Sequence, residues 1–315
     1  MKALVTGAAG FIGSHLCEGL IDAGYDVVAV DAFTDFYPRP VKERNVAGLR
    51  QSPRFTLAER PIAEADWLAL LDGVSHVFHL AAQAGVRKSW GREFRVYSEQ
   101  NIEATQILLE ACKARPLDRF VFASSSSVYG DRVPLPMRED ARLQPVSPYG
   151  VTKLAAEHLC LLYHATYGVP TVAVRYFTVY GPRQRPDMGF HRFFLAAMRD
   201  RPATVFGSGR QTRDFTYVTD AVAATMAAVH GRPGAVYNIG GGSRVELLEA
   251  LEHIRRVTGR SLPLDRVETQ AGDMRDTYAD TTCAQRELGF APAVALEEGL
   301  REQFEWMTRS GLFID

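Results

Sequence analysis

A glycine-rich segment near the N-terminus constrains the fold of this chain most strongly. The segment TGAAGFIG carries Gly7, Gly10 and Gly13 between an apolar run typical of a strand and a stretch with helical spacing. Glycines at this spacing permit a tight turn, the close approach of a pyrophosphate, and close packing of the helix on the strand. The unpaired N–H groups at the start of the helix then face the phosphates. The sequence therefore predicts a dinucleotide-binding strand–loop–helix unit.

Strand-like and helix-like segments alternate through the first half of the chain. Apolar runs at 2–8, 25–31, 74–82, 119–130 and 171–181 alternate with helical patterns at 11–24, 101–115 and 147–168. This alternation predicts an α/β fold with a Rossmann-type, doubly wound parallel sheet. The pattern becomes irregular after about residue 180. We expect a first domain over residues 1–175, a smaller, discontinuous α/β domain over most of 176–315, and a segment near 214–240 that returns to the first domain.

Composition and charge exclude several classes of protein. The chain has 315 residues and a formal net charge of -1, which disfavours a nucleic-acid binder with a broad basic face. No apolar run reaches the roughly 18 residues of a membrane span, and the N-terminus reads as a strand and not as a signal peptide. The four cysteines are scattered, and the eight histidines form no metal-ligand pattern. We expect a cytoplasmic protein with buried, unpaired thiols and no metal, membrane or nucleic-acid site.

Asp31 ends the second expected strand, where a carboxylate can select the dinucleotide. Such a carboxylate accepts hydrogen bonds from the adenosine ribose and repels a 2′-phosphate, so NAD is favoured over NADP. The alternative is an aspartate that only caps a turn.

Tyr149 and Lys153 form a Tyr-x-x-x-Lys pair in the long helical segment SPYGVTKLAAEH. At this spacing both side chains share one helix face. A free tyrosine has a pKa of about 10 and is a poor base at neutral pH. A nearby ammonium and the positive nicotinamide of NAD favour the phenolate. The spacing is common by chance, and it gains weight from the glycine loop and the serine-rich strand end that precede it.

Several segments together resemble the extended short-chain dehydrogenase/reductase family, and within it the NAD-dependent nucleotide-sugar epimerases and dehydratases. They are TGAAGFIG, HLAAQAGV, SSSSVYG, YGVTK, RYFTVYGP, RQTRDFTYVTD and YNIGGG. The resemblance covers essentially the whole chain. It implies a Rossmann-type domain that keeps NAD bound through turnover and a small domain that holds a nucleoside diphosphate sugar. It also implies a homodimer paired through helices near 98–114 and 148–167.

The resemblance assigns roles to individual residues. Tyr149 is the base for the sugar O4 proton, Lys153 holds the nicotinamide ribose, and Ser125 hydrogen-bonds O4. The resemblance and the glycine loop imply NAD contacts from Gly7, Gly10, Phe11, Ile12, Gly13, Asp31, Ile62, Leu80, Ala81, Ala82, Lys153 and Tyr176. Pro61 stands where family members often carry an aspartate that bonds adenine, so we expect backbone groups of Ile62 to hold that ring instead.

The residues after Ser125 bear on the reaction. Sugar dehydratases of the family carry Asp and Glu at the next two positions, and the related decarboxylases place a Glu just before Val-Tyr-Gly. Here both positions are serine, Ser126 and Ser127. Dehydration and that form of decarboxylation lose their usual proton donors, and 4-epimerisation remains. The alternative is that the two serines only cap the turn.

The segment GPRQRPDMGFHRF concentrates Arg183, Arg185 and Arg192 in a nearly neutral chain. It resembles the corresponding loop of UDP-glucuronate 4-epimerases, which implies that Arg185 reaches the C6 carboxylate of the sugar. Ser126 and Ser127 are then expected on the other face of that carboxylate. For Arg183 and Arg192 we favour surface ion pairs or diphosphate contact. A neutral hydroxymethyl group would leave the Arg185 charge uncompensated, which disfavours neutral sugars.

Further substrate contacts are expected around the nucleotide and the sugar. The resemblance places Arg213 on the diphosphate or uridine, Phe206 on uracil, Arg275 and Thr178 near the phosphates, and Arg87 in the sugar pocket. The alternatives are a core position for Phe206 and a surface ion pair for Arg275.

The expected reaction is the interconversion of UDP-glucuronate and UDP-galacturonate, through transient oxidation at C4 and return of the hydride after the ring has rotated. Three alternatives remain open. The first is a 4-epimerase of UDP-glucose or UDP-N-acetylglucosamine; Thr277 lies near the position where some epimerases carry a bulky residue that closes the sugar pocket. The second is a UDP-glucuronate decarboxylase, and the third is a non-catalytic NAD-binding regulator. Intact Ser125, Tyr149 and Lys153 argue against the regulator.

Overall fold

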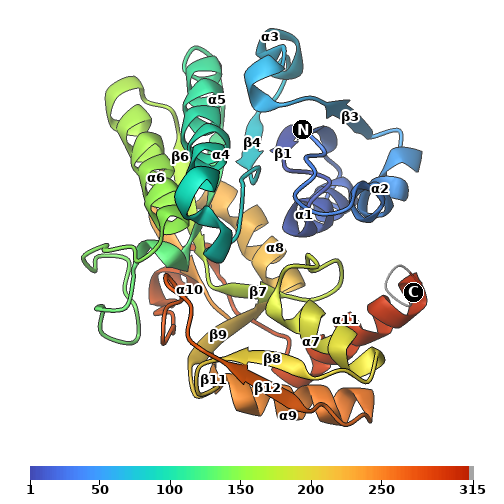
Figure 1. Ribbon diagram of the computed structural model, residues 1–315. Helices are drawn as coiled ribbons and strands as arrows, with labels where there is room; N and C mark the ends of the chain where they lie inside the picture. The colour runs from blue at the N-terminus through green and yellow to red at the C-terminus, as the bar shows by residue number, and fades with distance from the viewer. Residues whose placement is uncertain (312–315) are drawn as a thin grey trace.

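A seven-stranded parallel sheet forms the centre of the computed structural model, which describes residues 1–311 (Figure 1). Its strand order is β10-β6-β5-β4-β1-β2-β3, and every neighbouring pair is parallel. The strands are β1 (Lys2–Thr6), β2 (Asp26–Asp31), β3 (Phe55–Glu59), β4 (His76–His79), β5 (Arg119–Ser125), β6 (Thr171–Tyr176) and β10 (Val236–Ile239). Chain order reverses between β1 and β4, which is where open α/β sheets bind ligands at the carboxyl ends of their strands. The Rossmann-type prediction is confirmed.

Helices cover both faces of this sheet, because successive strand residues point to opposite sides. Leu4, Val28 and Phe120 pack into one apolar cluster, which also contains α5 and α6 side chains. Ala3, Val27 and Val121 pack into the other, together with α1 and α8. The helices around the sheet are α1 (Phe11–Asp22), α2 (Arg39–Ala47), α3 (Trp67–Leu70), α4 (Phe94–Tyr97), α5 (Ala104–Cys112), α6 (Pro148–Tyr167) and α8 (Val218–Ala227).

The long helix α6 has clear start and stop signals in the sequence. The Ser147 hydroxyl accepts a hydrogen bond from the Gly150 N–H at 3.1 Å, and Pro148 occupies the first turn. Gly168 ends the helix in the left-handed conformation, with a φ of 72°. Tyr149 lies in the first turn of α6, and Lys153 follows one turn later on the same helix face.

The remaining elements form a smaller layer beyond the carboxyl ends of the sheet (Figure 1). One sheet contains β7 (Thr178–Tyr180), β9 (Thr212–Tyr217) and β11 (Arg244–Glu246), and another pairs β8 (Ala203–Phe206) with β12 (Leu264–Val267). The helices here are α7 (Gly189–Met198), α9 (Leu247–Thr258), α10 (Thr282–Leu288) and α11 (Leu296–Ser310). β9 belongs to the small sheet, whereas β10 pairs with β6 of the large one. The division at residues 175 and 176 stays a prediction.

Two features of the large domain differ from the sequence pattern. The sequence pattern does not predict β3, because it is an edge strand in which only one of five residues is buried, so it forms no apolar run. The helix expected at 101–115 is preceded by α4 and by a π-helix over Ser98–Glu103, so α5 proper begins at Ala104. The short 3-10 helices are Leu49–Gln51, Ile62–Glu64, Arg87–Ser89, Gly91–Glu93, Ser126–Val128 and Ala228–His230.

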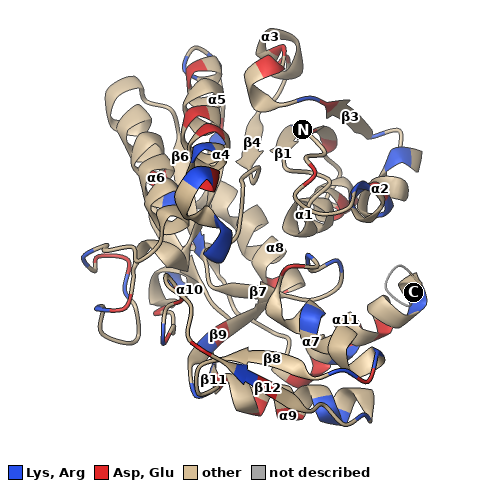
Figure 2. Cartoon of the chain, viewed as in Figure 1, with Lys and Arg blue, Asp and Glu red and all other residues tan. Residues whose placement is uncertain are grey.

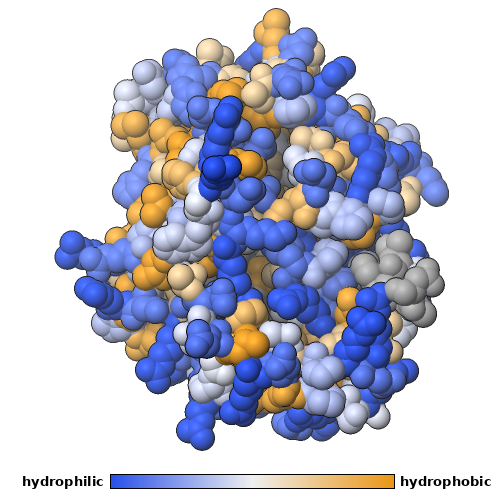
Figure 3. Space-filling view, viewed as in Figure 1, coloured by the Kyte–Doolittle hydropathy of each residue, from blue (hydrophilic) through white to orange (hydrophobic). Residues whose placement is uncertain are grey.

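The surface and the thiols agree with the near-neutral charge balance and the scattered cysteines. Basic and acidic residues are interspersed over the elements in Figure 2, and the face in Figure 3 is mainly hydrophilic with scattered apolar residues. Within residues 1–311, no helix is long and apolar enough to cross a membrane, and no group of side chains is arranged to hold a metal ion. Cys17, Cys112 and Cys160 are buried free thiols, and Cys283 is a part-exposed one.

Candidate active site

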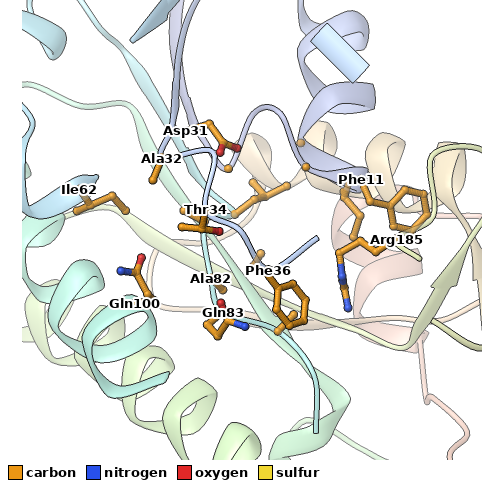
Figure 4. Close-up of a pocket in the computed structure, with 18 of the residues that line it drawn as sticks. Phe11, Asp31, Ala32, Thr34, Phe36, Ile62, Ala82, Gln83, Gln100 and Arg185 are labelled. Carbon is orange, nitrogen blue, oxygen red and sulfur yellow. The ribbon is translucent and has the colours of Figure 1, made fainter. Parts of the chain in front are cut away.

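A cavity opens at the carboxyl ends of β1, β2, β4 and β5, between the glycine loop and α6 (Figure 4). Ile62 and Gln100 lie toward one end of it, and Phe36 and Arg185 lie toward the other. Every residue predicted to contact the cofactor lines this cavity: Gly7, Gly10, Phe11, Ile12, Gly13, Asp31, Ile62, Leu80, Ala81, Ala82, Lys153 and Tyr176. The cavity also contains Tyr149 and Arg185, so the predicted base and the predicted carboxylate ligand share one space.

The glycine loop is built as its spacing predicts. Gly7 has a φ of 72°, which favours glycine. A Cβ atom on Gly13 would lie 2.1 Å from the Gly7 carbonyl oxygen, so no larger residue fits there. Gly10 precedes α1 without a side-chain cap, which leaves N–H groups of the first turn available to an anion. The loop therefore fits the pyrophosphate of a dinucleotide.

Asp31 both fixes the loop and lines the cavity. Its Oδ2 accepts a hydrogen bond from the Ala9 N–H at 2.9 Å, and its Oδ1 accepts one from the Phe33 N–H at 2.8 Å. Burial raises the pKa of this carboxyl, while the Phe33 N–H and the Lys42 ammonium act against that shift. The turn-capping interpretation thus describes part of its role. A carboxylate with two further lone pairs still faces the place expected for the adenosine ribose.

Tyr149 and Lys153 line the cavity from α6, and Ser125, at the end of β5 and outside the described cavity lining, lies within hydrogen-bonding reach of Tyr149. Burial raises the pKa of Tyr149, whereas a hydrogen bond with the Ser125 hydroxyl and the charge of Arg185 oppose that rise. Burial also lowers the pKa of the Lys153 ammonium to about 8. The Lys153 Nζ lies 4.4 Å from the centroid of the Phe122 ring, a cation–π contact. This arrangement suits transfer of one proton at a buried hydroxyl.

Buried polar groups hold the end of β5 in place behind these three residues. The Ser124 hydroxyl donates to the Glu157 carboxylate at 2.5 Å, and Glu157 pairs with Arg175 of β6 at 2.6 Å. Arg175 and Glu157 are 3% and 1% exposed, so the ion pair is fully desolvated. Ser124 itself lines the cavity, so this network connects the cavity wall to the interior.

Ser126 and Ser127 lie in the turn after β5. The Ser127 N–H donates to the Ser125 hydroxyl at 3.1 Å, as a turn cap does. Neither serine is among the described residues that line the cavity. Their contact with a sugar carboxylate stays a prediction.

Arg185 lines the cavity from the loop between β7 and α7. Its Nε donates to Asp187 Oδ1 and its Nη2 to Asp187 Oδ2, each at 3.0 Å. Its guanidinium carbon lies 5.9 Å from the centroid of the Phe36 ring. Asp187 therefore compensates the Arg185 charge within the loop itself, which corrects the argument that a neutral sugar would leave this charge unpaired. Arg183 of the same loop pairs with Glu18 of α1 at 2.6 Å, and Arg192 is exposed.

The residues predicted to hold the UDP half, and Arg87, which was predicted in the sugar pocket, lie outside the described lining of this cavity. The Arg87 guanidinium lies 3.7 Å from the centroid of the Phe206 ring and donates to Asp273 at 2.6 Å. Arg213 donates to the backbone oxygens of Met274 at 2.6 Å and Arg275 at 2.9 Å. The Arg275 side chain is 87% exposed. Thr178 begins β7, where it pairs in register with Phe215.

Sequence reasoning missed several residues of the cavity wall. They are Thr34, Phe36, Tyr37, Lys42, Arg60, Gln83, Ala84, Gln100 and Ser124. Lys42 is buried and donates to the Thr34 carbonyl oxygen at 2.7 Å. Nothing in the local sequence around Lys42 predicts that this lysine is buried near Asp31. The segment that contains it, DAFTDFYPRPVKERN, does resemble the corresponding segment of UDP-glucuronate 4-epimerases. Gln100 belongs to the π-helix, a feature often found at functional sites.

Comparison with known proteins supports this description. A model described as the NAD dependent epimerase/dehydratase family matches residues 3–240. An uncharacterized UDP-glucose epimerase of Bacillus subtilis is 45% identical, with 98% of each chain covered. A UDP-glucuronate 4-epimerase of Thermodesulfobacterium geofontis is 37% identical, with 96% of this chain and 95% of the relative covered. The crystal structure of UDP-glucuronic acid 4-epimerase from Bacillus cereus, in complex with UDP-glucuronic acid and NAD, is 44% identical and superposes with a TM-score of 0.96, covering 98% of this chain and 100% of that one.

Proposed function

The chain belongs to the NAD dependent epimerase/dehydratase family, and we propose that it is a UDP-glucuronate 4-epimerase that interconverts UDP-glucuronate and UDP-galacturonate. The observation that carries the proposal is that Arg185 lines the same cavity as Tyr149 and Lys153. An arginine fork recognises a planar carboxylate well. A uronate whose C6 carboxylate bound Arg185 would have its C4 hydroxyl near Tyr149, which supports the proposal.

The residues around the cavity fit NAD. The glycine loop and the open first turn of α1 would hold the pyrophosphate, and Asp31 would accept hydrogen bonds from the adenosine ribose. Ile62 lines the end of the cavity expected for adenine, and Lys153 and Tyr176 line the end expected for nicotinamide. When bound, NAD supplies reversible hydride transfer at C4 of the sugar.

The protein groups supply the proton transfer. Tyr149 takes the O4 proton as the C4–H bond is broken, and Ser125 hydrogen-bonds O4 as it becomes a carbonyl oxygen. The Lys153 ammonium favours the phenolate form of Tyr149 and hydrogen-bonds the nicotinamide ribose. After the ring presents its other face, Tyr149 returns the proton to O4, which gives the epimer.

The C6 carboxylate of the sugar must not be lost as carbon dioxide during this cycle. The 4-keto uronate is a β-keto acid, and it loses carbon dioxide most easily when the bond from C5 to the carboxylate aligns with the carbonyl π system. We propose that Arg185, together with Ser126 and Ser127, holds the carboxylate away from that alignment. The absence of an acidic residue at positions 126 and 127 supports epimerisation over dehydration.

Phe206, Arg213, Arg275 and Thr178 stay our candidates for the UDP half of the substrate, and Arg87 stays our candidate for the sugar pocket. Arg87 and Phe206 contact one another, and Arg213 borders the segment that carries Arg275. Arg213 and Arg275 are cationic, which suits a diphosphate. Uracil stacking on Phe206 requires the ring face that Arg87 leaves free, or a shift of Arg87.

We further propose a homodimer paired through residues 98–114 and 148–167. The helices α5 and α6 pack on one another at the outside of the molecule (Figure 1). Along α6, Val151, Leu162 and Tyr167 are about half exposed, at 47%, 55% and 52%. Leu154 packs inside the chain instead. We also place the protein in the cytoplasm, where its free thiols stay reduced.

A 4-epimerase of neutral UDP-sugars is the second candidate. The ion pair between Arg185 and Asp187 favours it, because the arginine charge has a partner without a substrate carboxylate. The Bacillus subtilis relative, 45% identical, is named as a UDP-glucose epimerase.

Chromatography of UDP-glucuronate after incubation with the purified protein, without added NAD, tests the proposal. We expect a UDP-galacturonate peak, which requires that NAD co-purifies and is regenerated. A UDP-pentose peak would make the protein a decarboxylase. An unchanged substrate peak, also with added NAD, together with conversion of UDP-glucose, would favour the neutral-sugar candidate.

A further inference from the structure

Asp187 is an acidic residue within the part of the loop that carries Arg185, and the proposed reaction does not use it. It lies two residues after Arg185 and binds the arginine through both carboxylate oxygens, at 3.0 Å each. The Arg185 and Asp187 side chains are 21% and 28% exposed, so the pair is shielded from much of the solvent. The geometry is the bidentate fork that a carboxylate ligand of the arginine would also adopt.

The fork leaves one edge of the guanidinium available. Asp187 engages Nε and Nη2, whereas both N–H groups of Nη1 and the second N–H of Nη2 have no partner among the described residues. Arg185 lines the cavity beside Tyr149, whose pKa its charge helps to hold down. In this arrangement, a sugar carboxylate that binds the free edge of Arg185 shares the guanidinium with Asp187.

Two carboxylates on one guanidinium repel one another at roughly 6 Å, and this repulsion weakens the grip on the substrate. Asp187 favours binding of a neutral sugar, because the Arg185 charge then keeps a partner when the sugar covers it. We propose that Asp187 is a specificity-determining residue that weakens binding of the uronate and permits binding of neutral UDP-hexoses at the same site. This inference rests on the proposed function of Arg185.

Weaker binding of the substrate carboxylate by Arg185 is compatible with the reaction. The ring has to leave one pose and adopt another between the two hydride transfers, and a carboxylate bound by an uncompensated arginine would resist that rotation. Asp187 keeps Arg185 oriented while lowering its net charge toward the substrate. The proposal therefore predicts that removal of the Asp187 charge raises the affinity for UDP-glucuronate relative to the affinity for UDP-glucose.

Calorimetric titration of both nucleotide sugars tests this in NAD-saturated protein that carries Tyr149→Phe, which slows turnover during the titration. With Asp187→Asn added, we expect UDP-glucuronate to bind about tenfold more tightly, after allowance for solvent screening of a part-exposed pair. UDP-glucose should bind with equal or several-fold lower affinity. Asp187→Glu should restore the original ratio, and Asp187→Ser is a second neutral variant if the asparagine variant folds poorly.

Glu18→Gln is the matched control, because it removes the carboxylate partner of Arg183 on the same loop. It should leave the ratio of the two affinities unchanged. Equal changes for both sugars in the Asp187 variants, or weaker binding of the uronate, would overturn the inference. If the parent protein binds UDP-glucose but no UDP-glucuronate, the proposed function itself fails, and this outcome is distinct from the others.

Discussion

Tyr149 and Lys153 lie one turn apart on α6 and line the same cavity, and burial shifts both toward their neutral forms. It raises the pKa of the tyrosine and lowers that of the lysine to about 8. The Ser125 hydroxyl and the Arg185 charge act against the shift at Tyr149. A bound NAD adds the positive nicotinamide ring, which further favours the phenolate.

Replacement of Tyr149 by phenylalanine should lower kcat by about 10²–10⁴-fold, the usual contribution of general acid–base catalysis. The glycine loop and Asp31 are untouched, so the purified variant should keep its NAD. Product formation and the absorbance of released cofactor measure the two effects. Full activity in the variant would mean that another group accepts the O4 proton.

The rate should depend on pH through Lys153. Its lowered pKa means that the ammonium is present below about pH 8 and is lost as the pH rises through that value. The ratio kcat/KM, which reports the free enzyme, should therefore fall on the alkaline side with an apparent pKa near 8. A profile measured from pH 6.5 to 9.5, a range of about three units around that value, that stays flat above pH 8 would contradict this role.

Substitution of Gly13 by alanine should abolish NAD binding. The added Cβ atom would lie 2.1 Å from the Gly7 oxygen, so the loop or α1 must shift. Gly48→Ala is a matched control, because Gly48 has a φ of -68° and a Cβ atom added there would meet nothing within 4 Å. The cofactor content of the purified proteins distinguishes the two variants.

Substitution of Arg185 by alanine should reduce kcat/KM for UDP-glucuronate by about 10²-fold, in line with loss of a charge-assisted, partly buried contact. It should also let some of the keto intermediate lose carbon dioxide, so a UDP-pentose appears among the products. Arg50→Ala removes a 46%-exposed arginine that pairs with Glu43, and it controls for the loss of one positive charge. Unchanged kinetics in the Arg185 variant would remove the main support for a uronate site.

The buried pair of Arg175 and Glu157 should dominate stability near the site. Arg175→Met leaves a buried carboxylate without its partner and should lower the free energy of unfolding by about 3–5 kcal/mol. Adding Glu157→Gln should recover part of that loss, because the buried charge is then gone. Chemical denaturation of the two variants measures the difference. Equal stabilities of the single and double variants would contradict the claim that the unpaired Glu157 charge causes the loss.

Local signals accounted for the parts of the fold that depend on near neighbours. The glycine spacing predicted the loop before α1, and the expected helical range 147–168 agrees with α6, which has Pro148 in its first turn and Gly168 at its end. β3 escaped notice because an edge strand needs no continuous apolar run. The expected cofactor residues line one cavity because they follow successive strands of one parallel sheet.

Contacts between distant segments had no such signal. Arg87 and Asp273 are 186 residues apart in sequence, and nothing local to either predicts their ion pair. Lys42 and Gln100 reach the cavity through the packing of α2 and of the π-helix, which periodicity does not reveal. Asp187 was visible in the sequence beside Arg185, but its partner depended on the conformation of the loop.

The most direct test of the account uses UDP-glucuronate that carries deuterium at C4, incubated with the purified protein without added NAD. We predict UDP-galacturonate that retains the deuterium at C4, as seen by NMR, because the hydride leaves and returns without exchange with water. A product with hydrogen at C4, or no UDP-galacturonate at all, would contradict the account.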